Sequence, residues 1–456
     1  MNSLWDHVAR PGATLTGEFH GAGGGGAVAD LARRSTLGGA LESLRGRSVL
    51  IATHSQLSTA MALIELDGVA GRIVLCPPDL PPALLPRIAA TAEADAIVSD
   101  IAPPSMLAAT FYPVTAQPTS PHSERRSNHR TEWVLLTAGT TGVPKLVVHT
   151  LDSLAGSLPR QAAAGRRCVW STFYDIRRYG GLQIYLRAVL SGAALVLSNA
   201  GETTRDFFTR AAARGVTHIS GTPSHWRRAL MSGDATLLTP EYVRLSGEVA
   251  DQALLNALQT IYPKAKIVHA FASTEAGVAF EVDDGLAGFP ADVLGEHGAI
   301  TLKEQDGTLR IRSRQGAARY LGDAPTIADG EGFVDTGDLV ELQAARYYFR
   351  GRQGGIINVG GLKVYPEEVE AVLNADPRVL MSLVRARRSP ITGAVVVADI
   401  VAAESVMMEP NAGQRLRMDL LNECRRALPA HKVPTSLHFV AALDMTSAGK
   451  LERRGA

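Results

Sequence analysis

Short apolar runs on either side of a helical segment govern what the first part of this chain can fold into. Ser48–Ala52 and Gly71–Cys76 are rich in Val, Ile and Leu, and Ser55–Leu66 between them carries apolar residues at helical spacing. Ala96–Ser99 is a further strand-like run. Strand, helix and strand in this order are typical of a parallel sheet covered by helices. We therefore expect an α/β protein.

The rest of the chain extends this pattern. At 456 residues it is too long for one ordinary domain and predicts at least two. The glycine run Gly21–Gly26 lacks a flanking strand–helix context and predicts a flexible turn, and the polar stretch Pro113–Arg130 predicts an exposed connection. The remaining expected elements are strands at Ala193–Leu197, Ile267–Ala270 and Val395–Val401, and a helix at Gln414–Leu428.

Charge and cysteine content exclude several function classes. Lys and Arg number 46 against 45 Asp and Glu, so nothing indicates a nucleic-acid or anionic membrane partner. The three cysteines, Cys76, Cys168 and Cys424, are far apart and are typical of reduced thiols in a cytoplasmic protein. No apolar run is long enough to span a membrane. The N-terminus carries an acid and no basic segment, so a signal peptide is not expected.

A loop of small and hydroxyl residues, Thr137–Lys145, reads Thr-Ala-Gly-Thr-Thr-Gly-Val-Pro-Lys. It lies between the apolar runs Trp133–Leu136 and Leu146–Val148. Glycines permit close backbone approach, and successive N–H groups can form an anion-binding nest. The hydroxyls add donors and Lys145 adds a positive charge. The loop predicts polyphosphate binding; a plain Gly/Thr hairpin turn with a solvated lysine is the alternative.

This loop is not a Walker A motif. That motif requires Gly-Lys followed by Ser or Thr at the start of a helix. Here Val143 and Pro144 separate Gly142 from Lys145, and Leu146 follows. A P-loop kinase or GTPase is therefore a poor match.

Four further segments follow the loop in the chain. They are Phe271-Ala272-Ser273-Thr274-Glu275, Asp335-Thr336-Gly337-Asp338, the stretch from Arg350-Gly351-Arg352 through Gly360-Gly361 to Glu370, and Ser447-Ala448-Gly449-Lys450. Together with the loop, and in this order, they resemble the motifs of the adenylate-forming superfamily. That superfamily contains acyl- and aryl-CoA synthetases, luciferases and peptide-synthetase adenylation domains. The resemblance runs from about Thr131 to the end of the chain, and the chain looks most like a short bacterial-type AMP-forming acyl-CoA synthetase.

The resemblance implies a fold and a reaction. The expected fold is a large N-terminal domain of parallel and mixed sheets with helices, residues 1–350, and a small mobile α+β C-terminal domain, residues 351–456. The expected reaction activates a carboxylic acid with ATP and Mg²⁺ through an acyl-adenylate, and then transfers the acyl group to the thiol of coenzyme A. Catalysis of this kind depends mostly on positioning and charge neutralisation.

The resemblance also assigns roles to individual residues. Lys450 is the expected bridge between the substrate carboxylate and the α-phosphate, Thr274 the α-phosphate donor and Glu275 the Mg²⁺ ligand. A solvated acid at Glu275 and a frayed basic tail at Lys450 are the alternatives. The expected nucleotide- and coenzyme-binding residues are Thr137, Gly139, Thr140, Thr141, Gly142, Lys145, Gly247, Phe271, Asp338, Arg352, Gly360 and Gly361. Within that set, Asp338 and Arg352 are expected at the ribose and Phe271 on the adenine, while surface ion pairing is the alternative for the first two.

Several positions depart from the pattern of relatives. Phe271 keeps the aromatic ring of the usual Tyr but loses its hydroxyl, Ala272 replaces a usual Gly, and Ala138 replaces a usual Ser. Gly354 stands where relatives often have an acidic or Lys hinge residue. Glycine absorbs large φ/ψ changes, so a hinge near Gly351–Gly355 is still expected. Gly360 and Gly361 are expected to line the pantetheine tunnel once the C-terminal domain has swung.

The sequence does not identify the acid. The segment around Ser246-Gly247-Glu248 is expected to line the acyl pocket. Arg177 or Arg178 could face an anionic acyl group, although a surface or salt-bridged arginine is favoured for at least one of them. Asp175 is the one local acid that could hold an amino-acid ammonium. The histidines His218, His225 and His269 are expected in core or capping roles.

Three functions stay open from the sequence. The first is an acyl- or aryl-CoA synthetase. The second is a freestanding adenylating enzyme that loads the phosphopantetheine thiol of a carrier protein, and basic residues Arg385, Arg387 and Arg388 suit either acceptor. The third is a non-catalytic nucleotide-binding regulator, which would have no use for Lys450.

Overall fold

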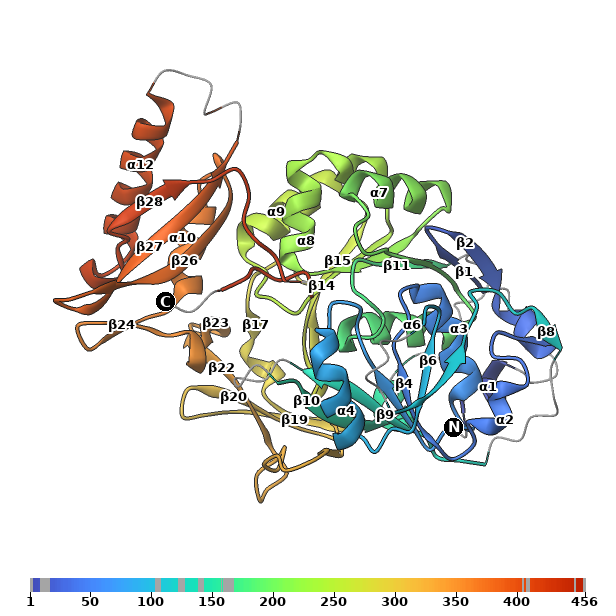
Figure 1. Cartoon of the computed structure of the whole chain (residues 1–456). Helices are drawn as coiled ribbons and strands as arrows, with labels where there is room; N and C mark the ends of the chain where they lie inside the picture. Colours follow the sequence, from blue (N-terminus) through green and yellow to red (C-terminus); the bar gives the residue numbers. More distant parts are fainter. Residues whose placement is uncertain are drawn as a thin grey trace.

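The structure is a computed structural model, and it describes residues 3–8, 17–102, 108–121, 128–137, 143–156, 158, 168–403, 406, 411–446 and 448–453. Most of the chain forms a large body of helices and sheets, and the segment after about residue 356 forms a smaller unit beside it (Figure 1). The N-terminus lies in the large body, whereas the segment after β28 reaches the large body and then returns, so that the chain ends beside the small unit (Figure 1).

An eight-stranded sheet, ordered β16-β15-β14-β13-β11-β12-β1-β2, carries much of the site. Its strands are parallel except at the two edges, where β16 and β2 are antiparallel to their neighbours. The strands are β1 (Glu18–Gly21), β2 (Gly24–Ala27), β11 (Val169–Thr172), β12 (Ala194–Leu197), β13 (His218–Gly221), β14 (Tyr242–Ser246), β15 (Lys266–Ser273) and β16 (Gly277–Val282). The helices that connect them are α6 (Tyr179–Ser191), α7 (Thr204–Ala213), α8 (Pro223–Met231) and α9 (Gln252–Ile261).

A seven-stranded sheet, ordered β21-β10-β9-β5-β4-β6-β7, is formed mostly by the earlier part of the chain. Its strands are β4 (Ser48–Ile51), β5 (Arg72–Leu75), β6 (Ala96–Ser99), β7 (Thr110–Pro113), β9 (Glu132–Thr137), β10 (Lys145–Thr150) and the later β21 (Arg319–Tyr320). Helix α3 (Gln56–Leu66) is buried along its whole length, in one apolar cluster with α6 and with strands of both large sheets. A helix that is apolar on every side is stable only when it is enclosed in this way.

An antiparallel six-stranded sheet follows, ordered β17-β23-β22-β20-β19-β18. Its strands are β17 (Phe289–Pro290), β18 (Gly295–His297), β19 (Ile300–Gln305), β20 (Thr308–Ser313), β22 (Val334–Gln343) and β23 (Arg346–Arg352). The smaller elements of the large body are α1 (Leu4–Val8), α2 (Ala40–Ser43), α4 (Leu85–Thr91), α5 (Leu151–Ala155), β3 (Arg34–Ser35) and β8 (Ser120–Pro121).

The C-terminal unit has an apolar core of its own, which spans Ile357 to Leu437. A short 3₁₀ turn, Gln353–Gly355, precedes it. The unit consists of the hairpin β24 (Ile357–Val359) and β25 (Leu362–Val364), the three-stranded sheet β26 (Val379–Ser389), β27 (Gly393–Ala402) and β28 (Ser436–Phe439), and helices α10 (Pro366–Asn374) and α12 (Ala412–Ala427). The α/β class and the two-part architecture are thus confirmed, while the domain boundary at residue 351 and the mobility stay predictions.

One sequence expectation is wrong. The run Gly21–Gly26 contains a turn only at Ala22 and Gly23, because Gly24–Ala27 forms edge strand β2 and pairs with β1. His20 stands opposite Gly25 in this pair, and a Cβ at Gly25 would overlap the imidazole. The missing side chain of Gly25 therefore makes room for His20. Among the described helices, none combines the length and the apolar character that crossing a bilayer requires.

Candidate active site

The two ends of the predicted phosphate loop face each other on a hairpin. Thr137 ends β9, Lys145 begins β10, and the two residues are cross-strand partners. The hydroxyl oxygen of Thr137 is buried and has no hydrogen-bond partner among the described residues, so it is available to a ligand. Ala138, Gly139, Thr140, Thr141 and Gly142 lie outside the described residues.

A tyrosine links this hairpin to the predicted metal ligand. The Nζ of Lys145 lies 5.0 Å from the centre of the Tyr320 ring. The Tyr320 hydroxyl donates a hydrogen bond of 3.2 Å to Oε1 of Glu275. Burial and the nearby Glu275 raise the pKa of Tyr320, so it stays a protonated donor. The sequence analysis missed Tyr320, because nothing in its own segment shows that β21 pairs with β10.

A buried histidine of β10 contacts the backbone of the Thr274–Glu275 segment. The His149 side chain is fully buried, and its Nε2 lies 2.7 Å from the carbonyl oxygen of Thr274. Because a carbonyl only accepts, Nε2 carries the proton, and Nδ1 lies 3.0 Å from the hydroxyl of Ser153. Burial lowers the pKa of His149 to about 4, although the bond to Thr274 opposes this shift. A neutral imidazole therefore fixes the backbone at Thr274. The sequence analysis missed His149 too, although it is the one polar side chain within the buried run Leu146–His149 of β10.

The two predicted ribose-binding residues form a pair on neighbouring strands. Asp338 of β22 and Arg352 of β23 are cross-strand partners, with 2.9 Å between Arg352 Nε and an oxygen of Asp338. The Asp338 side chain is 14% exposed and that of Arg352 is 66% exposed. Glu275 also interacts electrostatically with Arg352, which connects this pair to the Thr274–Glu275 segment.

Phe271 lies on β15 in a layer of aromatic rings. Its ring centre is 5.2 Å from that of Phe349 and 5.7 Å from that of Phe280, and both pairs are nearly parallel. The ring is thus held in one orientation by its neighbours, while its contact with adenine stays a prediction.

The C-terminal lysine reaches the loop after β14. Gly247 has a φ of +88°, and a Cβ built on it would lie 3.8 Å from Lys450 Nζ. Lys450 as a whole keeps solvent exposure. The protein around its ammonium nevertheless displaces water and lowers its pKa, with Arg352 as the next cause, whereas Glu248 and Asp338 act in the opposite direction. Lys450 therefore lies against Gly247 and within electrostatic range of the Asp338–Arg352 pair.

The residues around Lys450 form a turn seated on the start of α8. Met445 and Leu451 pair as an isolated β-bridge. The Thr446 amide donates a hydrogen bond of 2.7 Å to the Lys450 carbonyl. The hydroxyl of Thr222 donates to the carbonyl of Gly449. Gly449 has a φ of +71°, and a Cβ there would overlap the ring of His225. The described residues around Lys450 thus form a docked turn.

Gly360 and Gly361 lie elsewhere, at the turn between β24 and β25. Their φ values are +58° and +88°, a backbone that glycine adopts readily. The Gly360 amide donates a hydrogen bond of 2.9 Å to the carbonyl of Thr392, in the turn between β26 and β27. A Cβ at Gly361 would meet open space.

Two arginines near the predicted acyl pocket are both paired. Arg177 is 1% exposed and lies 2.5 Å from Asp175, and it also donates to the Thr53 carbonyl. Arg178 binds Asp79 at 2.7 Å. The expectation of a salt-bridged arginine is confirmed, and Asp175 is engaged by Arg177. The capping role expected of His225 is confirmed as well, since it completes the capping box of α8 with Thr222.

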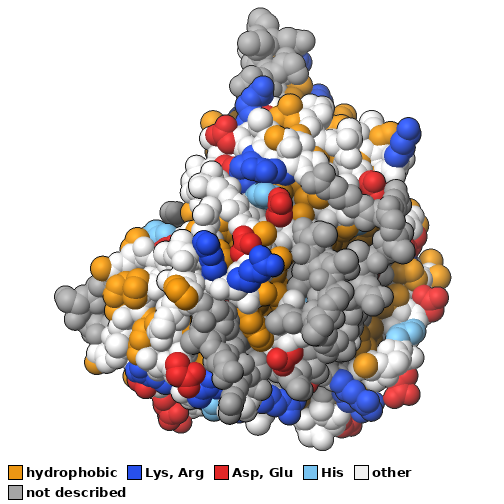
Figure 2. Space-filling view, turned by 90° about the vertical axis from the view of Figure 1, so that its right-hand side faces the viewer, with side chains coloured by type: hydrophobic (Ala, Val, Ile, Leu, Met, Phe, Trp, Pro, Cys, Tyr) orange, Lys and Arg blue, Asp and Glu red, His pale blue; other side chains and the backbone are white. Residues whose placement is uncertain are grey.

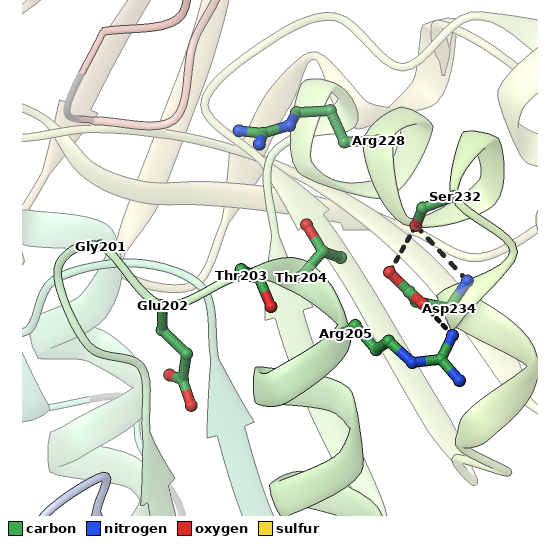
Figure 3. Close-up of a pocket in the computed structure, with 8 residues that line it drawn as sticks. All are labelled: Gly201, Glu202, Thr203, Thr204, Arg205, Arg228, Ser232 and Asp234. Carbon is green, nitrogen blue, oxygen red and sulfur yellow. Dashed lines mark hydrogen bonds and ion pairs between the residues drawn. The ribbon is translucent and has the colours of Figure 1, made fainter.

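Two adjoining clefts open beside these residues. The larger, about 620 Å³, is lined by Gly201–Arg205, Arg228, Ser232 and Asp234. Figure 3 shows Arg205 and Ser232 both directed at the buried Asp234, while Arg228 extends away from them. None of the predicted site residues lines this cleft. The second, about 530 Å³, includes Phe173 and His225, and His225 faces Gly449 of the lysine turn.

The surface matches the balanced charge of the chain. Figure 2 shows Lys and Arg side chains mixed with Asp and Glu on the face it presents, without one sign dominating. Within the part of the chain that the structure describes, no three His, Cys, Asp or Glu residues are grouped as a metal cage would require.

Comparisons with known proteins agree with this geometry. Residues 46–321 match the family of AMP-binding enzymes, and residues 368–450 match the AMP-binding enzyme C-terminal domain. The human mitochondrial acyl-coenzyme A synthetase ACSM5 is 24% identical over 429 residues, which cover 87% of this chain and 71% of the relative. The 2-succinylbenzoate–CoA ligase of Bacillus cytotoxicus is 27% identical over 353 residues, covering 70% and 68% of the two chains.

Solved structures share the fold at low identity. The anthranilate CoA ligase AuaEII, in complex with anthranoyl-AMP, superposes with a TM-score of 0.80 at 17% identity, over 98% of this chain and 95% of the other. The o-succinylbenzoate CoA synthetase of Bacillus subtilis superposes with a TM-score of 0.73 at 17% identity, over 98% of this chain and 96% of the other. The motif order, the two-part fold and the two family matches lead to one conclusion: this chain belongs to the AMP-binding enzymes of the adenylate-forming superfamily.

Proposed function

We propose that the protein is an AMP-forming acid–thiol ligase. It activates a carboxylic acid with ATP as an acyl-adenylate, releases pyrophosphate, and transfers the acyl group to coenzyme A to give an acyl- or aryl-CoA and AMP. The observation that carries the proposal is the position of Lys450 against Gly247 and within electrostatic range of the Asp338–Arg352 pair. A lysine brought there from the end of the chain serves a reaction at the α-phosphate.

The first half-reaction requires two anions to approach each other. The carboxylate oxygen attacks the α-phosphorus, and the bond to pyrophosphate breaks. In the proposal Lys450 bridges the two anionic groups and Thr274 donates to the α-phosphate, while Thr137, Lys145 and the glycine loop between them hold the outer phosphates. The unpartnered Thr137 hydroxyl and the nearby Lys145 support this arrangement. Donors fixed before the reaction avoid reorganisation when charge develops.

Glu275 fits a magnesium site that is completed by the substrate. It offers one carboxylate, oriented by Tyr320, and Mg²⁺ commonly binds one or two carboxylates together with phosphate oxygens and water. When bound, the ion would neutralise phosphate charge and stabilise the leaving pyrophosphate.

The nucleoside would rest on the neighbouring strands. Asp338 offers two acceptor oxygens to the ribose hydroxyls, with Arg352 beside it. Phe271, whose ring is fixed by Phe280 and Phe349, would contact the adenine. These assignments follow from the family motifs and the adjacency of the residues.

The second half-reaction would use a different face of the C-terminal unit. Gly360 and Gly361 sit on a hairpin turn, away from Lys450 in the chain, and a backbone without side chains lets a thin thiol arm pass. One unit cannot present both the lysine turn and this hairpin to the same phosphate at once, so the unit would rotate about the Gly351–Gly355 segment.

The acceptor is proposed to be coenzyme A rather than a carrier protein. The matched relatives are named as acyl-CoA synthetases and CoA ligases, which favours this choice. A carrier-protein thiol is the second candidate, since Arg387 and Arg388 lie on β26 beside Arg385, which itself pairs with Asp399. A cytoplasmic location completes the proposal and suits three free cysteines.

ATP–pyrophosphate exchange with Mg²⁺ tests the proposal first. The panel contains short, medium and long fatty acids, aryl acids, dicarboxylic acids and amino acids, because exchange reports adenylation whatever the acceptor. Exchange with any class establishes the first half-reaction, and coenzyme A and a phosphopantetheinyl carrier protein are then compared as acceptors. Measurable ATP binding without exchange across the panel would favour the non-catalytic regulator.

A further inference from the structure

The turn that carries Lys450 is held by contacts to both parts of the molecule. On the C-terminal side, Arg453 lies 2.7 Å from a carboxylate oxygen of the buried Glu370 and 3.4 Å from Glu367, both on α10. This anchor belongs to the same unit as the turn and would move with it. The contacts to the large body are therefore the ones that decide where Lys450 sits.

One carboxylate provides the central contact to the large body. Oε1 of Glu248 accepts a hydrogen bond of 2.9 Å from the amide of Leu451, the residue after the lysine. Oε2 of Glu248 accepts one of 3.0 Å from the amide of Ser224, in the first turn of α8. The side chain is only half-buried. A single side chain thus joins the start of a helix in one part to the lysine turn of the other.

The two bonds have unequal roles. The amide of Ser224 is one of the first N–H groups of α8, which lack partners inside the helix and attract an anion. This bond stays inside the large body and fixes the orientation of the carboxylate. The bond to Leu451 crosses between the two parts and forms only when the turn is docked.

The surrounding contacts make this docked position specific. Thr222 donates to the Gly449 carbonyl, and the His225 ring occupies the space in front of the Gly449 α-carbon. The carboxylate of Glu248 also interacts electrostatically with Lys450. When Leu451 is bound to Glu248, the Lys450 side chain extends over Gly247.

We propose that Glu248 is the docking residue for the lysine turn: its carboxylate holds the Leu451 amide in the adenylate-forming arrangement and releases it before the thiol step. The inference rests on the proposed two-step function. Glu248 is a positioning residue, because it acts through the backbone that bears Lys450.

Half-reaction measurements on Glu248→Gln and Glu248→Ala test this role. A glutamine offers one acceptor oxygen where two amides must be satisfied, and alanine offers none. We expect pyrophosphate exchange to fall about tenfold for Glu248→Gln and about 10²-fold for Glu248→Ala, because charge-assisted hydrogen bonds are lost. The KM for ATP should change by less than about twofold. Thioester formation from supplied acyl-adenylate should be unchanged or faster.

A second measurement does not depend on activity. Spin labels at Leu237→Cys in the large body and Met418→Cys on α12, both at exposed positions, report the distance between the two parts in a Cys168→Ser background. We expect the Glu248→Gln substitution to reduce the docked population in the distance distribution. Glu42→Gln, which removes a partner of Arg45 at the surface, is the matched carboxylate control and should leave both readouts as in the parent.

The outcomes separate the inference from the proposed function. Wild-type protein without exchange on any acid contradicts the function, and the distance distributions then still test the docking. Equal losses in both half-reactions, or an unchanged distance distribution together with unchanged exchange, overturn the role of Glu248. Loss of folding in Glu248→Ala would appear in thermal denaturation, and Glu248→Gln then carries the test.

Discussion

The two halves of the active site are held in place by different means. The Thr274–Glu275 segment rests on His149, a fully buried imidazole that binds the Thr274 carbonyl from within the sheet. The lysine turn rests on a surface of the large body through a few polar contacts from Thr222 and Glu248. Buried polar contacts are costly to break, and the lysine turn has one of these, to Thr222, beside the half-exposed bond to Glu248 that can exchange with water. The support of the Thr274–Glu275 segment is thus internal to the large body, whereas the lysine turn depends on contacts between the two parts, as the proposed movement of the C-terminal unit requires.

Removal of the lysine itself should give the largest effect. We expect Lys450→Ala to lose adenylation by about 10²–10³-fold, roughly 3–4 kcal/mol of transition-state stabilisation, because one well-placed donor disappears. ATP binding should largely survive, since the substitution leaves the Thr274–Glu275 segment and the Asp338–Arg352 pair unchanged. Pyrophosphate exchange and nucleotide titration measure the two quantities. Lys432→Ala, which removes the partner of Glu368 within the C-terminal unit, is the control. Near-full exchange in Lys450→Ala would refute the assignment.

A substitution in the β24–β25 turn should separate the two chemical steps. We expect Gly361→Leu to spare adenylate formation and to reduce thioester formation by roughly 10²-fold, because a side chain would obstruct the thiol arm. Gly361→Ala tests whether the positive φ alone causes the loss. Rapid-quench assays follow acyl-adenylate and thioester separately. Equal losses in both steps would argue against the alternation of the C-terminal unit.

Replacement of His149 should lower stability and loosen the Thr274–Glu275 segment. We expect His149→Ala to cost about 1–3 kcal/mol in the free energy of unfolding, because the Thr274 carbonyl loses its donor. The KM for Mg·ATP should also rise. His149→Gln, whose amide can still donate to the Thr274 carbonyl, should show a smaller loss of stability and a smaller rise in KM. Urea unfolding and steady-state kinetics measure these changes. An alanine variant with wild-type stability and KM would show that Thr274 needs no such support.

The smallest expected effect is a pH dependence of stability that arises from the same residue. The pKa of His149 is lowered to about 4 in the folded protein, so the unfolded chain binds more protons between that value and about 6.5. Stability should therefore be full above about pH 6.5 and fall as the pH drops toward 4, by up to about 3 kcal/mol from His149. His225, whose pKa is lowered to about 3 by burial, adds to the same slope. His149→Gln should flatten the curve of unfolding free energy against pH; an unchanged slope would mean that His149 is not the group that titrates.

The same comparison explains what the sequence could and could not predict. The strands at Ser48–Ile51, Arg72–Leu75 and Ala96–Ser99 were within reach because each forms from a local apolar run. The five motifs identified the family, since their order is a property of the chain itself.

Contacts between distant segments were out of reach. His149 and Thr274 are 125 residues apart, and Glu248 and Leu451 are 203 apart. Neither pairing leaves a periodic signal. The edge strand Gly24–Ala27 was missed for a related reason: Gly25 leaves space for the side chain of His20 on the neighbouring strand. The sequence thus proposes which residues carry the chemistry, whereas the residues that position them are visible only in the fold.

The contact between Gly449 and the His225 ring bears on how sequences of this kind can be read. Because the imidazole occupies the place of a side chain, and because the φ of Gly449 is +71°, a larger residue at position 449 would require His225 to move or the turn to dock elsewhere. Positions 449 and 225 are therefore expected to change together in chains that keep this docked turn.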